Sequence, residues 1–146
     1  MQLSEKGLKL IKRSEGYRSH EYLDCAGLRT IGYGHRLAPT DSYPNGIEEY
    51  YAETLLAADV FCAENAVKRF VTVPLTQGQF DALVDFVFNL GSSRLRHSTL
   101  LADLNKGLYA EAARQLLLWD HSGMRIVEGL KERREAEFNL WNGKAA

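Results

Sequence analysis

The stretch DCAGLRTIGYGH, residues 24–35, decides which kind of fold this chain adopts. Asp24 and Gly27 bracket a short loop between two runs that have the composition of β-strands, 17–23 and 28–35. Turn residues of this kind between two such runs indicate a β-hairpin. We therefore expect a small hairpin in this part of the chain.

The glycines of the return strand follow a period of two. With alternating side chains, Thr30, Gly32 and Gly34 lie on one face of the strand, which then carries a single hydroxyl and is otherwise bare. Such a flat wall lets a bulky ligand approach backbone groups that can bind sugar hydroxyls or acetamido groups. The alternative is a hairpin whose glycines only provide twist. A phosphate loop is disfavoured, because a dinucleotide fingerprint needs a third glycine where this chain has Leu37.

Helical patterns surround the hairpin on both sides. Ser4 is a suitable N-cap for a first helix that Gly16 ends. Apolar residues at spacings of three and four predict further helices over 48–70, 76–91, 97–105, 109–119 and 128–141. The apolar face expected for the long helix comprises Tyr51, Leu55, Ala58, Cys62, Ala66 and Phe70. Burial is expected for the leucine run 116–118, and exposure for Lys131, Glu132, Arg134 and Glu135.

This order of elements predicts an α+β fold that is mainly α. We expect a single domain over 1–146. Its β-hairpin lobe would cover about 15–46, and its helical lobe would be formed by 1–14 and 47–146.

The composition argues against several classes of protein. The net charge is −1, from 18 basic and 19 acidic residues, so the basic footprint of a nucleic-acid-binding protein is absent. Apolar runs stop at about four residues, whereas a membrane span needs about 18, and we expect no membrane insertion. Cys25 and Cys62 are too few for a disulfide framework and are expected to be free thiols in a reducing cytosol.

Two pairs of side chains around the hairpin are candidates for catalysis. Glycoside hydrolysis needs one protonated and one ionised carboxyl at a single bond, and Glu15 at a helix end and Asp24 at a wet hairpin tip provide that asymmetry. Cys25 and His35 flank the same hairpin and could form a thiolate–imidazole pair. Asp24 opposes this second pair, because its charge disfavours the thiolate. No metal-ligand spacing such as C-x2-C or H-x3-H is present.

Three segments of this region carry a family resemblance. Together EGYR (15–18), YLDCAG (22–27) and TIGYGH (30–35) resemble the active-site signature of the phage-type lysozymes, the endolysins of glycoside hydrolase family 24. The resemblance continues, in order, through VPLT (73–76), QFDAL (79–83), FNLG (88–91), STLL (98–101), LNKG (104–107), Trp119 and the segment 129–137.

The resemblance implies a lysozyme-like fold with a cleft between the lobes. It implies hydrolysis of the β-1,4 bond between N-acetylmuramic acid and N-acetylglucosamine in bacterial peptidoglycan, with no metal or cofactor. Glu15 would be the general acid, and Asp24 and Thr30 would position and activate the attacking water in an inverting mechanism. Direct attack by Asp24 is the alternative.

The resemblance also suggests an arginine of the C-terminal helix beside the acid, with Arg133 as the better match and Arg134 as the alternative. A cation there favours ionised Glu15, which runs against its role as an acid. Either substrate must displace the pair or burial must offset it. The candidate substrate contacts are Gly32, Gly34 and Asn89. His35 is expected to be a packing and hydrogen-bonding residue.

The near-neutral charge departs from many of these enzymes, which are basic. We therefore expect modest salt dependence or a local basic patch, for which the candidates are Lys9, Lys12, Arg13 and Arg133. The protein is expected to be a monomer that accumulates in the host cytoplasm and is released through a separate holin pore to the periplasm and cell wall.

Two other functions stay open at this point. One is a peptidoglycan-binding relative without catalysis, which the intact Glu15, Asp24 and Thr30 oppose. The other is a peptidase or amidase that uses Cys25 and His35 on the peptide stems. Products with 1,6-anhydro ends would instead indicate a lytic transglycosylase.

Overall fold

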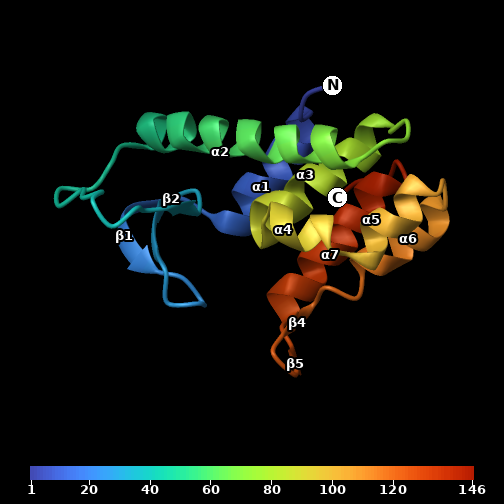
Figure 1. Cartoon of the computed structure of the whole chain (residues 1–146). Coiled ribbons are helices and arrows are strands. Elements are labelled where there is room, and N and C mark those ends of the chain that lie inside the picture. Colours follow the sequence, from blue (N-terminus) through green and yellow to red (C-terminus); the bar gives the residue numbers. More distant parts are fainter.

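The structure, a computed structural model, describes residues 1–146 and is mainly helical. Its helices are α1 (Glu5–Glu15), α2 (Glu49–Phe70), α3 (Gln77–Leu90), α4 (Ser92–Arg96), α5 (Thr99–Asn105), α6 (Tyr109–Leu116) and α7 (Glu128–Trp141). Its strands are β1 (Arg18–Leu23), β2 (Arg29–Gly32), β3 (His35–Arg36), β4 (His121–Ser122) and β5 (Arg125–Ile126). Strands β1 to β3 form a lobe beside the helices, and α2 runs from that lobe across the helical lobe (Figure 1). The predicted fold class, α+β and mainly α, is confirmed.

Helix α1 begins and ends where the sequence predicts. The Ser4 hydroxyl accepts a hydrogen bond from the Gly7 amide and caps the first turn. Gly16 ends the helix with a φ of +69°, a left-handed conformation that glycine adopts without strain. The chain therefore turns sharply after Glu15, which is left at the junction of the two lobes.

The prediction of a continuous return strand is wrong. Strand β2 ends at Gly32, with φ +65°, the chain turns through Tyr33 and Gly34, with φ +71° at Gly34, and His35 begins β3, which pairs back with β2. Because these left-handed residues break the alternation, Gly32 and Gly34 do not share a flat face. Gly32 is buried, and a Cβ there would lie 3.1 Å from the Cβ of Ala52. Its glycine is needed for the close approach of β2 to α2.

Two hydrogen bonds hold the β lobe against α2. The Tyr33 hydroxyl donates to Glu49 Oε1 at 2.7 Å, and this bond, together with burial, raises the pKa of Tyr33 to about 12. The second bond joins His35 Nδ1 to Asp59 Oδ2 at 2.7 Å. His35 is therefore a hydrogen-bonding residue between the lobes.

The buried face of α2 differs from the predicted one. Of the predicted face only Ala66 is buried, whereas Tyr51, Ala58 and Cys62 are exposed. The residues that are buried are Ala52, Leu56, Val60, Ala63, Glu64, Ala66 and Val67. Apolar residues surround most of this helix, so spacings of three and four occur on more than one face and do not select between them.

Helix α3 forms the centre of the helical lobe and packs against α1, α2 and α7. Thr76 and Gln79 make a capping box at its start. Its residues 80–87 are all buried, including the acids Asp81 and Asp85. On the neighbouring α7, Arg134 is fully buried, so its predicted exposure is wrong. The polar groups that bind Arg134 inside the protein lie on α3 and α7.

Two short elements have no counterpart in the predicted pattern. Helix α4 directly follows Gly91, and the β4–β5 hairpin projects from the helical lobe ahead of α7 (Figure 1). Both are too short to produce a periodic signal. The expected burial of the leucine run is complete only for Leu116, while Leu118 is exposed. None of the helices is both long and apolar enough to cross a bilayer.

Candidate active site

Glu15 places its carboxylate between the two lobes, where its side chain is 19% exposed. One oxygen, Oε2, lies against Gly34, and a Cβ on that residue would be only 2.5 Å from it. Gly34 also has a φ of +71°, which side chains of L-residues rarely tolerate. The carboxylate and the turn therefore both require glycine at this position, for reasons other than the flat wall predicted from the sequence.

Arg133 of α7 lies between two carboxylates. Its Nη1 donates to Glu15 Oε1 at 2.7 Å, while Nε and Nη2 donate to the two oxygens of Asp85 at 2.9 Å each. The side chains of Arg133 and Asp85 are 6% and 0% exposed. Burial alone would raise the pKa of Asp85, but the Arg133 guanidinium holds it below its usual value. Of the two arginines expected beside the acid, Arg133 is the one in contact with Glu15.

Two more charged side chains of α7, Arg134 and Glu137, are fully buried near this ion pair. Arg134 Nη2 donates to Glu137 Oε1 at 2.6 Å and to Asn89 Oδ1 at 2.9 Å. Burial raises the pKa of Glu137 well above its usual value, although Arg134 acts in the opposite direction. Because a guanidinium only donates, the amide oxygen of Asn89 faces Arg134, and its NH₂ group is left for other partners. We call Glu15, Arg133, Asp85, Glu137 and Arg134 the buried charge cluster.

On the other side of the site, Asp24 belongs to the tight turn between β1 and β2. Its Oδ1 accepts hydrogen bonds from the amides of Ala26 and Leu28 at 2.8 and 2.9 Å, and its Oδ2 accepts none. The turn therefore orients the carboxylate and leaves one oxygen free. We call residues 24–28 the hairpin tip.

Thr30 and Tyr22 face each other across the β1–β2 pair. Thr30 is 3% exposed, and its hydroxyl donates to the carbonyl oxygen of Leu28 at 2.8 Å. Burial raises the pKa of Tyr22, and the negative charges of Glu15 and Asp24 raise it further. Tyr22 thus lies within electrostatic range of both carboxylates, which the sequence nominated independently.

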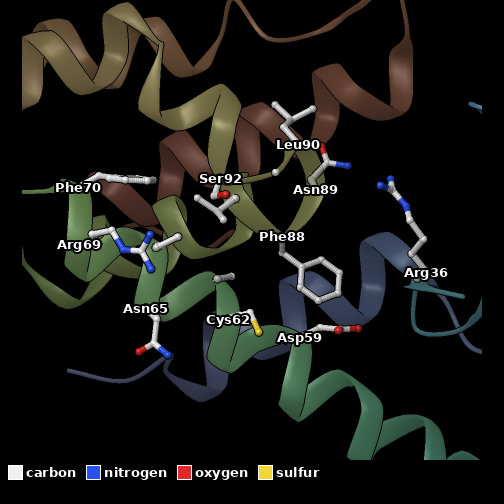
Figure 2. Close-up of a pocket in the computed structure, with 15 residues that line it drawn as sticks. Arg36, Asp59, Cys62, Asn65, Arg69, Phe70, Phe88, Asn89, Leu90 and Ser92 are labelled. Carbon is white, nitrogen blue, oxygen red and sulfur yellow. The ribbon is translucent and has the colours of Figure 1, made fainter. Parts of the chain in front are cut away.

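A cavity of about 690 Å³ has Gly34 in its lining, and the Glu15 carboxylate lies against that same residue. Residues of α2, α3 and α4 line most of it. Figure 2 shows Arg36 and Arg69 at opposite ends, with Phe88 and Asn89 of α3 between them. Its volume is in the range of small-ligand sites, roughly 300–1,000 Å³. The cavity can therefore receive a ligand of saccharide size next to Gly34.

The cysteines and histidine singled out in the sequence do not form a catalytic pair. Cys25 is an exposed free thiol at the hairpin tip, and Cys62 is an exposed free thiol on α2. The Nδ1 atom of His35 is bound to Asp59, and no hydrogen bond joins His35 to Cys25. No group of three or more His, Cys, Asp or Glu side chains is arranged to hold a metal ion.

The sequence reasoning missed Tyr22, Asp85 and Glu137. A signal for Asp85 was available, since it is an acid within the otherwise apolar run ALVDFVF, 82–88, and a charge inside a buried helix face needs a partner. Tyr22 lies only two residues before the candidate Asp24, and this closeness in sequence was the available signal. Glu137 gave no such signal, because charged residues are common throughout α7.

Known proteins were compared with this chain at the levels of sequence and structure. The model of the phage lysozyme family matches residues 12–137. An endolysin of Bacillus phage B103 is 42% identical over 144 residues, and an endolysin of Salmonella phage P22 is 40% identical over 144 residues. Each alignment covers 97% of this chain, with 54% of the Bacillus phage protein and 98% of the P22 protein. The chain therefore spans about half the length of the former and almost all of the latter.

The similarity extends to solved structures. The muramidase domain of SpmX from Asticaccaulis excentricus matches with a TM-score of 0.87 and 33% identity, over 96% of this chain and 97% of that domain. The shared fold, the identity to endolysins over almost the whole chain and the match of the family model to residues 12–137 lead to one assignment: this chain belongs to the phage lysozyme family.

Proposed function

We propose that this chain hydrolyses the β-1,4 bond between N-acetylmuramic acid and N-acetylglucosamine in bacterial peptidoglycan, with inversion at the sugar carbon. The observation that carries the proposal is the partly shielded carboxylate of Glu15, which one arginine binds and which lies against Gly34, a residue that lines a cavity of saccharide size. Membership of the phage lysozyme family supports peptidoglycan as the substrate.

Glu15 acts as the general acid. Its Oε1 is bound by Arg133, whereas Oε2 has no hydrogen-bond donor from the chain and lies beside Gly34. Oε2 is therefore the oxygen that donates a proton to the leaving glycosidic oxygen. The leaving sugar departs with a new hydroxyl, and the ionised Glu15 that remains is paired with Arg133.

Asp24 and Thr30 hold the attacking water. The Thr30 hydroxyl hydrogen is used by the Leu28 carbonyl, so its oxygen accepts a hydrogen bond from the water. Asp24 Oδ2, which has no other partner, takes the second proton as the water oxygen attacks the anomeric carbon from the face opposite the leaving group. Inversion requires the two carboxyls to stand about 6.5–9.5 Å apart, so that the water fits between substrate and Asp24.

The cavity binds the sugar on one side of the scissile bond. Arg134 binds the side-chain oxygen of Asn89. The two N–H donors of the Asn89 side chain are therefore directed to a hydroxyl or an acetamido carbonyl of the sugar. Gly34 lets the ring approach the backbone next to the acid, which replaces the glycine-wall role originally assigned to both Gly32 and Gly34. Phe88 supplies an apolar surface in the same cavity, against which the C–H face of a pyranose can pack.

Digestion of purified peptidoglycan tests this function through the chemical ends that it creates. We expect new reducing sugar ends, and proton NMR of the fresh products should show the inverted anomer first. New free amino groups would support the Cys25 and His35 alternative, 1,6-anhydro ends a transglycosylase, and an absence of products a binding protein without catalysis.

Two variants test the roles of individual residues in the same assay. Glu15→Gln should lower the rate by roughly 10²–10⁴-fold, the usual contribution of general acid catalysis. Cys25→Ser should retain most of the activity, because the thiol has no contact with the acid or its partners. Substantial lysis by folded Glu15→Gln would exclude the mechanism.

A further inference from the structure

Glu15 has a neighbour that conflicts with the chemistry proposed for it. A general acid must carry a proton, but a guanidinium at 2.7 Å stabilises the form that has lost it. An unshared cation beside Glu15 would therefore hold the acid ionised at the pH where it has to work. Some other group must offset the charge of this cation, and α3 carries an acid that binds it.

Asp85 is placed to offset the charge of Arg133. It binds two of the three donating guanidinium nitrogens, both at 2.9 Å, whereas Glu15 binds one. The pair is bidentate and buried, so solvent screens it little. The geometry also fixes the guanidinium plane, since Nε and Nη2 are both held and only Nη1 points at Glu15.

The Glu137 carboxyl supports Asp85 from behind. It is fully buried, its Oε2 has no hydrogen-bond partner, and burial and the negative charge of Asp85 both raise its pKa. A carboxylate has no hydrogen to donate, and Asp85 is already the acceptor for Arg133. A proton on Glu137 gives its Oε2 a hydrogen that it can donate to Asp85, and Asp85 then remains the charged member.

We propose that Asp85 is a positioning residue for the reaction, because it orients Arg133 toward Glu15 and offsets the guanidinium charge so that Glu15 can carry its proton. Glu137 serves as a neutral donor that keeps Asp85 ionised. The proposal rests on the general acid role of Glu15 given above. It adds two residues, on α3 and α7, that the substrate does not touch.

The charged groups that face Glu15 and Asp85 come from β1 and α7. Glu15 faces Arg133 of α7 and Tyr22 of β1, and Tyr22 in turn contacts Arg18, whose guanidinium lies 4.5 Å from the ring centre. Asp85 faces Arg133, Glu137 and Arg134, which are all residues of α7. Asp85 is thus the one acid that shares Arg133 with Glu15.

The test is the pH dependence of kcat/KM for wild type and Asp85→Asn on a soluble peptidoglycan fragment. Asparagine keeps the shape of the side chain but removes its charge, so Glu15 becomes the only counter-ion of Arg133. We expect the basic limb of the profile to move to lower pH by about one unit. Activity at pH 7 should fall about tenfold, recover as the pH is lowered, and leave KM nearly unchanged.

Asp81→Asn is the matched control. Asp81 is also a buried acid of α3, one helical turn before Asp85. Its Oδ1 accepts hydrogen bonds from the backbone amide of Ser4 at 2.9 Å and from the side-chain Nε2 of Gln77 at 2.8 Å, and it has no bond to Arg133. Its loss should lower stability without moving the limb. Because Glu137 could ionise once Asp85 is neutral, the double variant Asp85→Asn/Glu137→Gln is measured alongside and should shift at least as far as the single one.

Carbon-13 NMR of the wild-type side-chain carboxyls keeps the test independent of catalysis and of variant folding. We expect Asp85 to be ionised and Glu137 to be protonated at pH 7. A protonated Asp85 at pH 7, or an Asp85→Asn profile that matches that of Asp81→Asn, would overturn the proposal. Failure of the proposed function would appear separately, as an active Glu15→Gln variant.

Discussion

Glu15 and Asp24 carry the same functional group in opposite surroundings. On the helical side, Glu15 is bound by Arg133, which is buried and shared with Asp85. On the hairpin side, Asp24 lies at a partly exposed turn and is bound only by backbone amides of that turn. The helical side depends on contacts between α1, α3 and α7, which are far apart in sequence, whereas the hairpin tip is complete within five residues.

This difference links the energetics of the two sides to their chemistry. A buried ion pair is costly to break, because the partner that remains is a charge without solvent. A carboxylate in a wet turn has little such cost, since water replaces any lost contact. Substitutions on the helical side should therefore change stability and activity together, whereas substitutions at the hairpin tip should change activity almost alone.

Arg133→Met should have the largest effect on stability. Methionine fills much of the space but leaves Asp85 buried without its cation, which typically costs about 3–5 kcal/mol. The measurement is urea unfolding at pH 7, with the exposed Lys131→Met on the same helix as control. A loss of less than 1 kcal/mol would mean that the buried charge cluster adapts to the change and that the contrast between the two sides is overstated.

Glu137→Gln should increase stability, and by an amount that depends on pH. The pKa of Glu137 is raised above its usual 4.5 in the folded protein. Its contribution is therefore full below pH 4.5 and is lost as pH rises toward the folded-state pKa, at up to about 1.4 kcal/mol per pH unit. Glutamine keeps a donor and does not titrate, so the variant should gain on the wild type from pH 5 to pH 7.

Unfolding free energies at pH 5, 6 and 7 check this prediction. Glu135→Gln, an exposed position two residues earlier on α7, should follow the wild type at all three values. If the difference between Glu137→Gln and wild type stays constant with pH, then Glu137 is ionised in the folded protein and does not donate to Asp85.

The contrast between the two sides also explains how much of the site could be predicted from sequence. Local features were sufficient for the hairpin tip, for the Ser4 cap and for the start of α7, since each depends on neighbours within a few residues. The ion pair of Arg133 with Glu15 was expected only through the family resemblance. The partnership with Asp85 was not expected at all, because residues 48 positions apart in sequence are joined only by the packing of α7 on α3.

The errors had the same origin. The turn at Tyr33 and Gly34 replaced the predicted strand because glycine permits both extended and left-handed backbone, and the choice depends on the contact with Glu15. The buried face of α2 was misplaced because its apolar residues are spread around the helix, so tertiary contacts rather than periodicity select the face. In both cases the missing information was a contact between lobes.

Gly34→Ala should have an intermediate effect, as expected for a residue between the two sides. The left-handed backbone costs a residue with a Cβ about 1–2 kcal/mol, and the methyl group would displace the Glu15 carboxylate. Activity should fall at least as far as in Asp85→Asn, while circular dichroism remains like that of the wild type. Gly27→Ala is the control, since its φ of +78° is similar but a Cβ there meets no atom within 4 Å. Equal loss of activity in both variants would mean that backbone strain, rather than the carboxylate, explains the effect.

Asp24→Asn should change stability least, by no more than about 0.5 kcal/mol. The asparagine oxygen can still accept from the Ala26 and Leu28 amides, so the turn should keep its shape, but the NH₂ group that replaces Oδ2 cannot take a proton from water. Hydrolysis should therefore fall by two or more orders of magnitude, roughly the contribution of a general base, with an unfolding curve that overlays that of the wild type. Asp24→Ala separates the two effects, because it removes the turn contacts as well and should cost about 1 kcal/mol more. An active Asp24→Asn would assign the water to Thr30 alone, and a strongly destabilised one would show that the hairpin tip depends on its charge as much as the helical side depends on Arg133.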